Sequence, residues 1–144
     1  MAPIHRPLFA LMLLAFGASA WAGPQRLATG PEGDVVFTTP SGNIGCHYIP
    51  AGGTSTYESA DGGAELQCDR VAPRYVTVIL GQNAKARRIN EPGEQGCCAI
   101  VQNLDYGRSW SAGPFTCLSQ QKGLSCKSRA GHGFFISRAK IEVY

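Results

Sequence analysis

The stretch PFTCLSQQKGLSCKS, residues 114–128, is the most direct indication of the fold. Two short runs rich in apolar residues flank the turn signal Lys122-Gly123, which is typical of a β-hairpin. Cys117 and Cys126 stand in the two arms, so hairpin pairing would bring them opposite each other. A bridge there closes about 10 residues and contributes roughly 2.7 kcal/mol in the chain-entropy model. The stretch therefore predicts a disulfide-bonded hairpin.

A second hairpin of the same kind is predicted upstream. NIGCHYI (43–49) and AELQCDR (64–70) each carry one cysteine, Cys46 and Cys68, on either side of a glycine-rich stretch. That stretch, residues 50–63, has the composition of a long hairpin loop. A bridge across it closes about 23 residues and contributes roughly 3.4 kcal/mol. The likeness of the two hairpins favours local pairing of all four cysteines.

The rest of the chain follows the same pattern of short strands and tight turns. No stretch of ten or more residues keeps a helical period after the N-terminal segment, and at most Ser137 caps one helical turn through Ile141. We expect an all-β fold, a single small antiparallel sandwich or barrel stapled by disulfides. The predicted strands are residues 34–39, 43–49, 64–70, 74–80, 85–90, 98–103, 114–119, 124–128 and 133–137.

The remaining two cysteines, Cys97 and Cys98, are adjacent in EQGCCAIV. Neighbouring Cα atoms lie about 3.8 Å apart across a trans peptide, closer than the 4.4–6.8 Å of ordinary bridges. A bridge between neighbours would therefore bend the backbone and close too small a loop to stabilise through loop entropy. Three alternatives stay open: a vicinal disulfide, crossed bridges with the other four cysteines, or two free thiols.

The N-terminal sequence predicts export. Residues 1–22 combine Arg6, an apolar run and the small-x-small signal Ala20-Trp21-Ala22, so we expect signal-peptide cleavage near Ala22. Removal of this leader leaves about 120 residues, 23–144, as one β-domain without a membrane span. Six cysteines, an even number, indicate an oxidising compartment, periplasmic or secreted.

Charge argues against nucleic acid as a partner. The formal net charge of +3 falls to +2 when Arg6 is removed with the leader. This value is too close to neutral to indicate a nucleic-acid partner. The basic cluster at Lys85, Arg87 and Arg88 is typical of a solvated strand face.

Catalytic motifs are not recognisable in the sequence. The mature part has His47 and His132 without metal-ligand spacing, and it contains no nucleophile motif of the GxSxG type and no phosphate loop. We therefore expect no metal and no cofactor. His47 follows Cys46 on a strand, so the two side chains should point to opposite faces. The candidate binding residues, chosen for exposed turn positions, aromatic character or charge, are Tyr106, Trp110, His132 and Arg138.

Two segments resemble a family of small exported bacterial proteins. Its pattern is F-x-[ST]-P-S-G-N-I-x-C near the start, here FTTPSGNIGC (37–46), and G-x-G-F-x-[LIV]-S-R at the end, here GHGFFISR (131–138). The family is known as a domain of unknown function, so the resemblance implies export, paired cysteines and a compact domain but no activity. Its members carry a cysteine in the middle and another before a Y-G motif. This chain has Cys97-Cys98 before LDYG instead, which favours a vicinal bridge.

Three functional hypotheses follow. The leading one is a non-enzymatic exported β-domain that binds a protein or glycan at the envelope, or inhibits an enzyme there. The alternative is thiol–disulfide chemistry at Cys97-Cys98. A third is a hydrolase that uses His132 with Asp105 or Asp69 and a serine.

Overall fold

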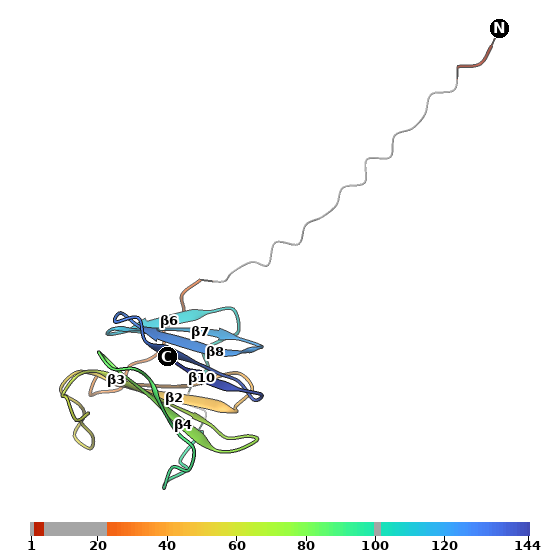
Figure 1. Ribbon diagram of the computed structural model, residues 1–144. Helices are drawn as coiled ribbons and strands as arrows, with labels where there is room; N and C mark the ends of the chain where they lie inside the picture. Colours follow the sequence, from red (N-terminus) through yellow and green to blue (C-terminus); the bar gives the residue numbers. More distant parts are fainter. Residues whose placement is uncertain (1, 5–22, 100–101) are drawn as a thin grey trace.

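The computed structural model describes residues 2–4, 23–99 and 102–144, and its described part is all-β, with two five-stranded antiparallel sheets. The predicted leader, apart from residues 2–4, lies outside the described residues. The sheets stack face to face as a sandwich, one above the other in Figure 1. The strands are β1 (Val35–Thr38), β2 (Ile44–Ile49), β3 (Glu65–Arg70), β4 (Val76–Gly81), β5 (Arg87–Ile89), β6 (Ser109–Ala112), β7 (Phe115–Gln120), β8 (Gly123–Ser128), β9 (Gly133–Ile136) and β10 (Ile141–Val143).

Each sheet is a simple meander, because strands that follow one another in sequence pair with one another. The first sheet has the order β1-β2-β3-β4-β5 and the second has the order β10-β9-β8-β7-β6. One long connection, residues 90–108, passes from β5 of the first sheet to β6 of the second. Two of the hairpins have the features expected from sequence: a two-residue turn joins β7 to β8, and residues 50–64 join β2 to β3.

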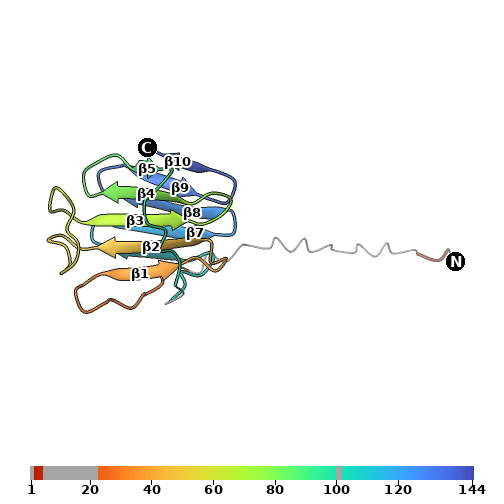
Figure 2. The same ribbon diagram turned by 90° about the horizontal axis from the view of Figure 1, so that it is seen from below.

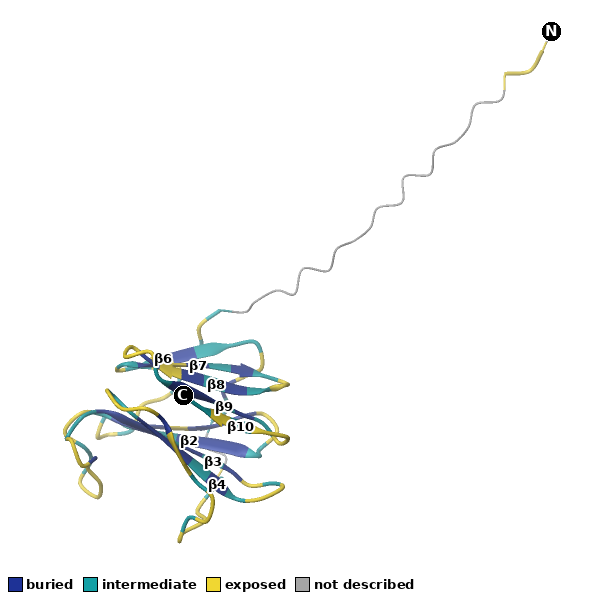
Figure 3. Ribbon diagram, in the orientation of Figure 1, coloured by how far each residue is buried: buried dark blue, intermediate teal, exposed yellow. Residues whose placement is uncertain are grey.

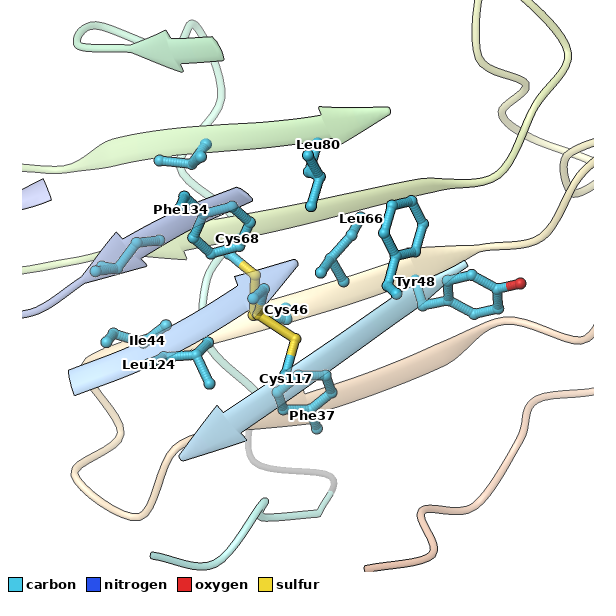
Figure 4. Packing of buried hydrophobic residues seen from close by; sticks show 14 of the residues in the cluster. Phe37, Ile44, Cys46, Tyr48, Leu66, Cys68, Leu80, Cys117, Leu124 and Phe134 are labelled. Atoms are coloured by element: carbon cyan, nitrogen blue, oxygen red, sulfur yellow. A yellow bond between two sulfur atoms is a disulfide. The ribbon is translucent and has the colours of Figure 1, made fainter. Parts of the chain in front are cut away.

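Alternation of side chains along the strands builds the core. In β2, Ile44, Cys46 and Tyr48 are buried in the main core cluster, whereas His47 between them is half-exposed. The buried faces of the two sheets meet in the middle of the sandwich, while the turns and loops around it are exposed (Figure 3). Figure 4 shows core side chains of both sheets pointing toward one another between the strands.

A row of paired residues crosses the first sheet through its disulfide. Phe37 of β1 pairs with Cys46, Cys46 pairs with Cys68, and Cys68 pairs with Val78 of β4. Cys46 and Cys68 are disulfide-bonded, and their exposed fractions are 3% and 0%. The bridge therefore lies inside the core and joins the second and third strands of the sheet.

The second sheet repeats this arrangement. Trp110 of β6 pairs with Cys117, which pairs with Cys126, its disulfide partner. Here too the bridge joins the second and third strands in chain order, and Cys126 pairs onward with Phe134 of β9. The likeness of the two cysteine hairpins, visible in the sequence, thus extends to an aromatic residue beside each bridge.

Aromatic rings connect the two sheets. The rings of Phe37 and Trp110 have centroids 5.0 Å apart at an interplanar angle of 56°. Tyr48 packs edge-on against Trp110 and Phe115, at centroid distances of 5.9 and 6.0 Å. Tilted and edge-on contacts of this kind add to the stabilisation that burial alone provides.

The observed strands differ from the predicted ones in the connection and at the C-terminal end. The prediction of a strand at 98–103 is wrong for its described residues, where only Asn103 forms an isolated bridge, with Thr38. Strands β6 and β10 were not predicted, and β10 lies where a helical turn through Ile141 was the alternative. Both are edge strands of three or four residues that carry polar side chains, so they lack the apolar run that marks a buried strand.

Among the described residues, no helix has the length and apolar character needed to cross a membrane.

Candidate functional site

The adjacent cysteines Cys97 and Cys98 are bonded to each other, so the structure has the vicinal bridge among the three alternatives. They belong to the connection between β5 and β6, and the part of it before residue 100 lies on the face of the first sheet turned away from the core (Figure 1). A short stretch of this connection, residues 96–99, is called the cysteine segment below. Both cysteines are half-buried.

Gly45 of β2 is the point on the sheet against which the bridge packs. A Cβ atom at Gly45 would lie 2.6 Å from Sγ of Cys97 and 2.7 Å from Sγ of Cys98. Distances below 3.0 Å are closer than Cβ atoms approach other atoms, so only glycine leaves room for the sulfurs. Gly45 was not predicted as a site residue, although a glycine between Ile44 and Cys46 inside a strand signals a close approach.

A tyrosine holds the cysteine segment from the side of β4. The backbone N–H of Cys97 donates a hydrogen bond to the hydroxyl oxygen of Tyr75 at 2.9 Å. Burial raises the pKa of Tyr75, and the charge of Asp69 and a hydrogen bond to its carboxylate raise it further, while the Cys97 N–H acts in the opposite direction. Asp69 also accepts a hydrogen bond from Thr77 Oγ1. A chain of polar contacts thus connects the segment to β3 and β4.

Beyond the cysteine segment, the chain is fastened to the edge strand β1. Thr38 N–H donates to Gln102 O at 2.9 Å, and Leu104 N–H donates to Thr38 O at 2.9 Å. The side chain of Gln102 donates to the carbonyl oxygens of Ala28 and Val36, both at 2.9 Å, and accepts from Ala28 N–H at 2.7 Å. The connection is therefore anchored at Cys97 itself and again at residues 102–104.

A cavity of about 250 Å³ lies between the cysteine segment and the outer face of the first sheet. The bridge and the side chains of Val36 and Ala99 give it apolar lining. Figure 2, which views this sheet from outside, shows the connection passing in front of its strands. The lining also includes the polar side chains of His47, Gln67 and Asp69, and Thr38 of β1.

The polar side chains of the cavity are held in place by neighbours and keep hydrogen-bonding capacity. His47 Nε2 lies 3.1 Å from Asp34 Oδ2, and Gln67 Nε2 donates to Glu65 Oε1 at 2.7 Å. Within the described part of the chain, His47 Nδ1 and Gln67 Oε1 have no hydrogen-bond partner. Fixed side chains with unused donors or acceptors beside an apolar wall form an arrangement suited to binding.

The four candidate binding residues from the sequence do not form one site. Trp110 is 3% exposed and belongs to the core, whereas Tyr106 is 38% exposed at the surface. Tyr106 and Arg138 line a common cleft at one end of the sandwich. His132 lies in the turn between β8 and β9, near Ser128, at the opposite end of β7 and β8.

The residues of the hydrolase hypothesis are also apart. Gly107, two residues after Asp105, donates its backbone N–H to the carbonyl oxygen of Ser119 near the end of β7. The carbonyl oxygen of His132 accepts from Ser128 N–H, and Ser128 pairs with Phe115 at the start of β7. At about 3.3 Å per residue, these ends of β7 are separated by more than 10 Å. Asp69 lies on the outer face of the other sheet. The structure therefore does not assemble this constellation.

Among the described residues, no group of three or more His, Cys, Asp and Glu side chains is placed to hold a metal ion.

The side chains of Cys46 and His47 point to opposite faces of β2, as predicted from their adjacency. Cys46 points into the core and His47 points outward.

Comparison with known proteins gives no assignment: no protein-family model matches the chain, and neither the curated proteins nor the solved structures show a significant match. Function has to be argued from the site itself.

Proposed function

We propose that this chain is an exported binding domain that holds one ring of a glycan in the cavity between the Cys97-Cys98 bridge and the first sheet. The observation that carries the proposal is the composition of this cavity, which joins an apolar disulfide wall to three polar side chains, His47, Gln67 and Asp69. Sugar rings need both features, because they expose C–H groups on their faces and hydroxyl groups at their edges.

The size of the cavity supports a ligand that is only partly enclosed. Its volume of about 250 Å³ lies just below the range of about 300–1,000 Å³ in which complete small molecules are bound. One ring of a longer chain could enter while its neighbours remain in solvent. This fits a glycan of the cell envelope better than a small free metabolite.

The compartment is part of the proposal. Disulfides persist in the periplasm and outside the cell and are rare in reducing compartments. All six cysteines are paired, and the leader predicted at residues 1–22 and the family resemblance both favour export. An oxidising compartment would preserve the Cys97-Cys98 bridge, on which the cavity depends.

The test is a titration of the ¹⁵N-labelled protein (residues 23–144) with chitotriose, cellotriose and maltotriose, followed by amide chemical shifts. We expect at least one sugar to give saturable shifts at His47, Gln67 and Cys98. The variant Gln67→Ala should weaken the affinity about tenfold, because a buried sugar hydroxyl would lose its partner. Gln95→Ala is the matched control, since Gln95 lies on the same connection but does not line the cavity.

Absence of saturable shifts with all three sugars would reject the glycan as ligand. Equal weakening by Gln67→Ala and Gln95→Ala would place the binding elsewhere on the surface.

A further inference from the structure

A second cleft, of about 200 Å³, opens at one end of the sandwich and shares no lining residue with the cavity at Cys97-Cys98. Four parts of the chain that are distant in sequence meet around it. They are the β1–β2 turn, the segment before β6, the β7–β8 turn and the β9–β10 turn. The residues that carry the inference are Tyr106, Gln120, Gln121, Lys122 and Arg138.

Two cations from different turns line this cleft without a partner. Neither Lys122 nor Arg138 makes an ion pair or a side-chain hydrogen bond to any described residue. Lys140, only two residues from Arg138, instead pairs with Glu142 at 3.0 Å. Among the residues that the structure describes, no carboxylate lines the cleft, so the two positive charges have no neutralising group there.

Three neutral side chains beside the cations are also without a partner among the described residues, whereas Thr39, Ser41, Asn43 and Ser137 of the lining are hydrogen-bonded. The hydroxyl of Tyr106 and the side-chain amides of Gln120 and Gln121 have no hydrogen-bond partner within the described ranges. All three can donate hydrogen bonds. Two cations and three neutral donors thus surround a space free of negative charge, which is the lining that an anion requires.

The turns that carry these groups are fixed by the fold. Gly123, directly after Lys122, lies so close to β9 that a Cβ atom there would be 2.5 Å from the carbonyl oxygen of Ile136. The guanidinium of Arg70, buried at the end of β3, donates to Ser137 O at 3.2 Å and to Arg74 O at 3.3 Å. The first contact ties the β9–β10 turn to the first sheet, so the backbone positions from which the two charged side chains extend are fixed in advance of binding.

We infer that this cleft is an anion-binding site that accepts a single oxyanion group, a carboxylate or a phosphate, carried by a larger partner. The guanidinium of Arg138 can bind two oxygens of such a group at once, and the ammonium of Lys122 contributes a point charge. Tyr106 and the two glutamines then donate to the remaining oxygens. The volume of about 200 Å³ admits the charged group itself and leaves the rest of the partner outside.

The experiment uses sodium phosphate and sodium acetate as separate probes at constant pH and ionic strength, with chloride replaced by the probe. Amide shifts of the ¹⁵N-labelled protein report binding. We expect saturable shifts at Tyr106, Lys122, Gly123 and Ser137 with at least one probe, and the probe that saturates identifies the group. The double variant Lys122→Gln/Arg138→Gln should weaken that affinity at least tenfold, since it removes both charges.

The matched control is Lys127→Gln/Arg129→Gln, which removes the same charge from exposed positions outside the cleft. It should leave the affinity within about twofold. Linear shifts with both probes, or equal weakening by the two double variants, would overturn the inference, because either result describes general screening of surface charge. Tyr106→Phe provides a milder second variant, which removes only one hydroxyl and should still weaken the binding.

Discussion

Gly45 and Cys97, 52 positions apart in sequence, are in contact: a Cβ atom on Gly45 would lie 2.6 Å from the sulfur of Cys97. The glycine is part of a regular strand, paired with Asp69 of β3 and Thr38 of β1. Glycine is therefore required here by the close contact with Cys97-Cys98, and not by a turn of the backbone. This contact determines where the cysteine segment crosses the first sheet.

Substitution of this glycine tests the contact. Gly45→Ala should push the cysteine segment away from β2 and lower the free energy of unfolding by about 1–3 kcal/mol, the usual cost of overpacking. Urea denaturation measures the stability, and amide hydrogen exchange at Cys97 reports the displacement. Gly96→Ala is the control, because a Cβ atom there has nothing within 4 Å. Unchanged exchange in Gly45→Ala would contradict the placement of the segment.

The three disulfides should contribute unequally to stability. Removing Cys46–Cys68 as a double alanine variant should cost about 3.4 kcal/mol of loop entropy, and removing Cys117–Cys126 about 2.7 kcal/mol, with packing losses in addition. Cys97→Ala/Cys98→Ala closes no loop of useful size and should cost less than either. Thermal denaturation of the three variants measures the order, and a vicinal variant less stable than both others would refute it.

Tyr75 should make stability depend on pH in the alkaline range. Its pKa in the folded protein is raised above the ordinary value of 10.0, mainly by burial and also by Asp69. The unfolded chain therefore releases the proton first, and this contribution to stability is complete below pH 10 and is lost as pH rises through the folded pKa. In Tyr75→Phe, the free energy of unfolding should decline less steeply above pH 10.

Denaturation in urea at a series of pH values between 8 and about 11.5 measures this slope. The same variant should exchange the Cys97 amide proton faster, because its acceptor is gone. Tyr106→Phe, at a surface remote from this hydrogen bond, should leave that exchange rate unchanged. A Tyr75→Phe protein with the wild-type slope would show that the hydroxyl titrates alike in both states.

The Phe37–Trp110 contact should couple the two sheets. Phe37→Leu and Trp110→Phe should each destabilise the fold, and the double variant should lose less than the sum of both. The expected coupling is about 0.5–1.5 kcal/mol, the value of an aromatic pair beyond its burial. A double-mutant cycle in urea measures it. The pair Phe115 and Phe37, with no ring contact given by the structure, serves as the control cycle and should be nearly additive.

Local sequence patterns predicted most of the fold. Short apolar runs between turn signals predicted eight of the ten strands to within two residues at each end, for example β2 and β7. The pairings of Cys46 with Cys68 and of Cys117 with Cys126 followed from hairpin geometry, because a hairpin places the middle of one arm opposite the middle of the other. These features depend on residues close together in sequence, and a single sequence contains that information.

The sites depend on contacts that only the tertiary structure decides. Gly45 and Tyr75 contact the cysteine segment, and Gln67 lines the same cavity, because part of a long connection lies across the outer face of the first sheet. Local sequence has no signal for this path. Tyr106 and Arg138 share a cleft because the segment before β6 and the β9–β10 turn reach the same end of the sandwich. Trp110 is buried in the core, where its ring contacts Phe37 and Tyr48. Period-two alternation determines which face of a strand is buried, whereas the packing of distant segments determines which exposed residues come together.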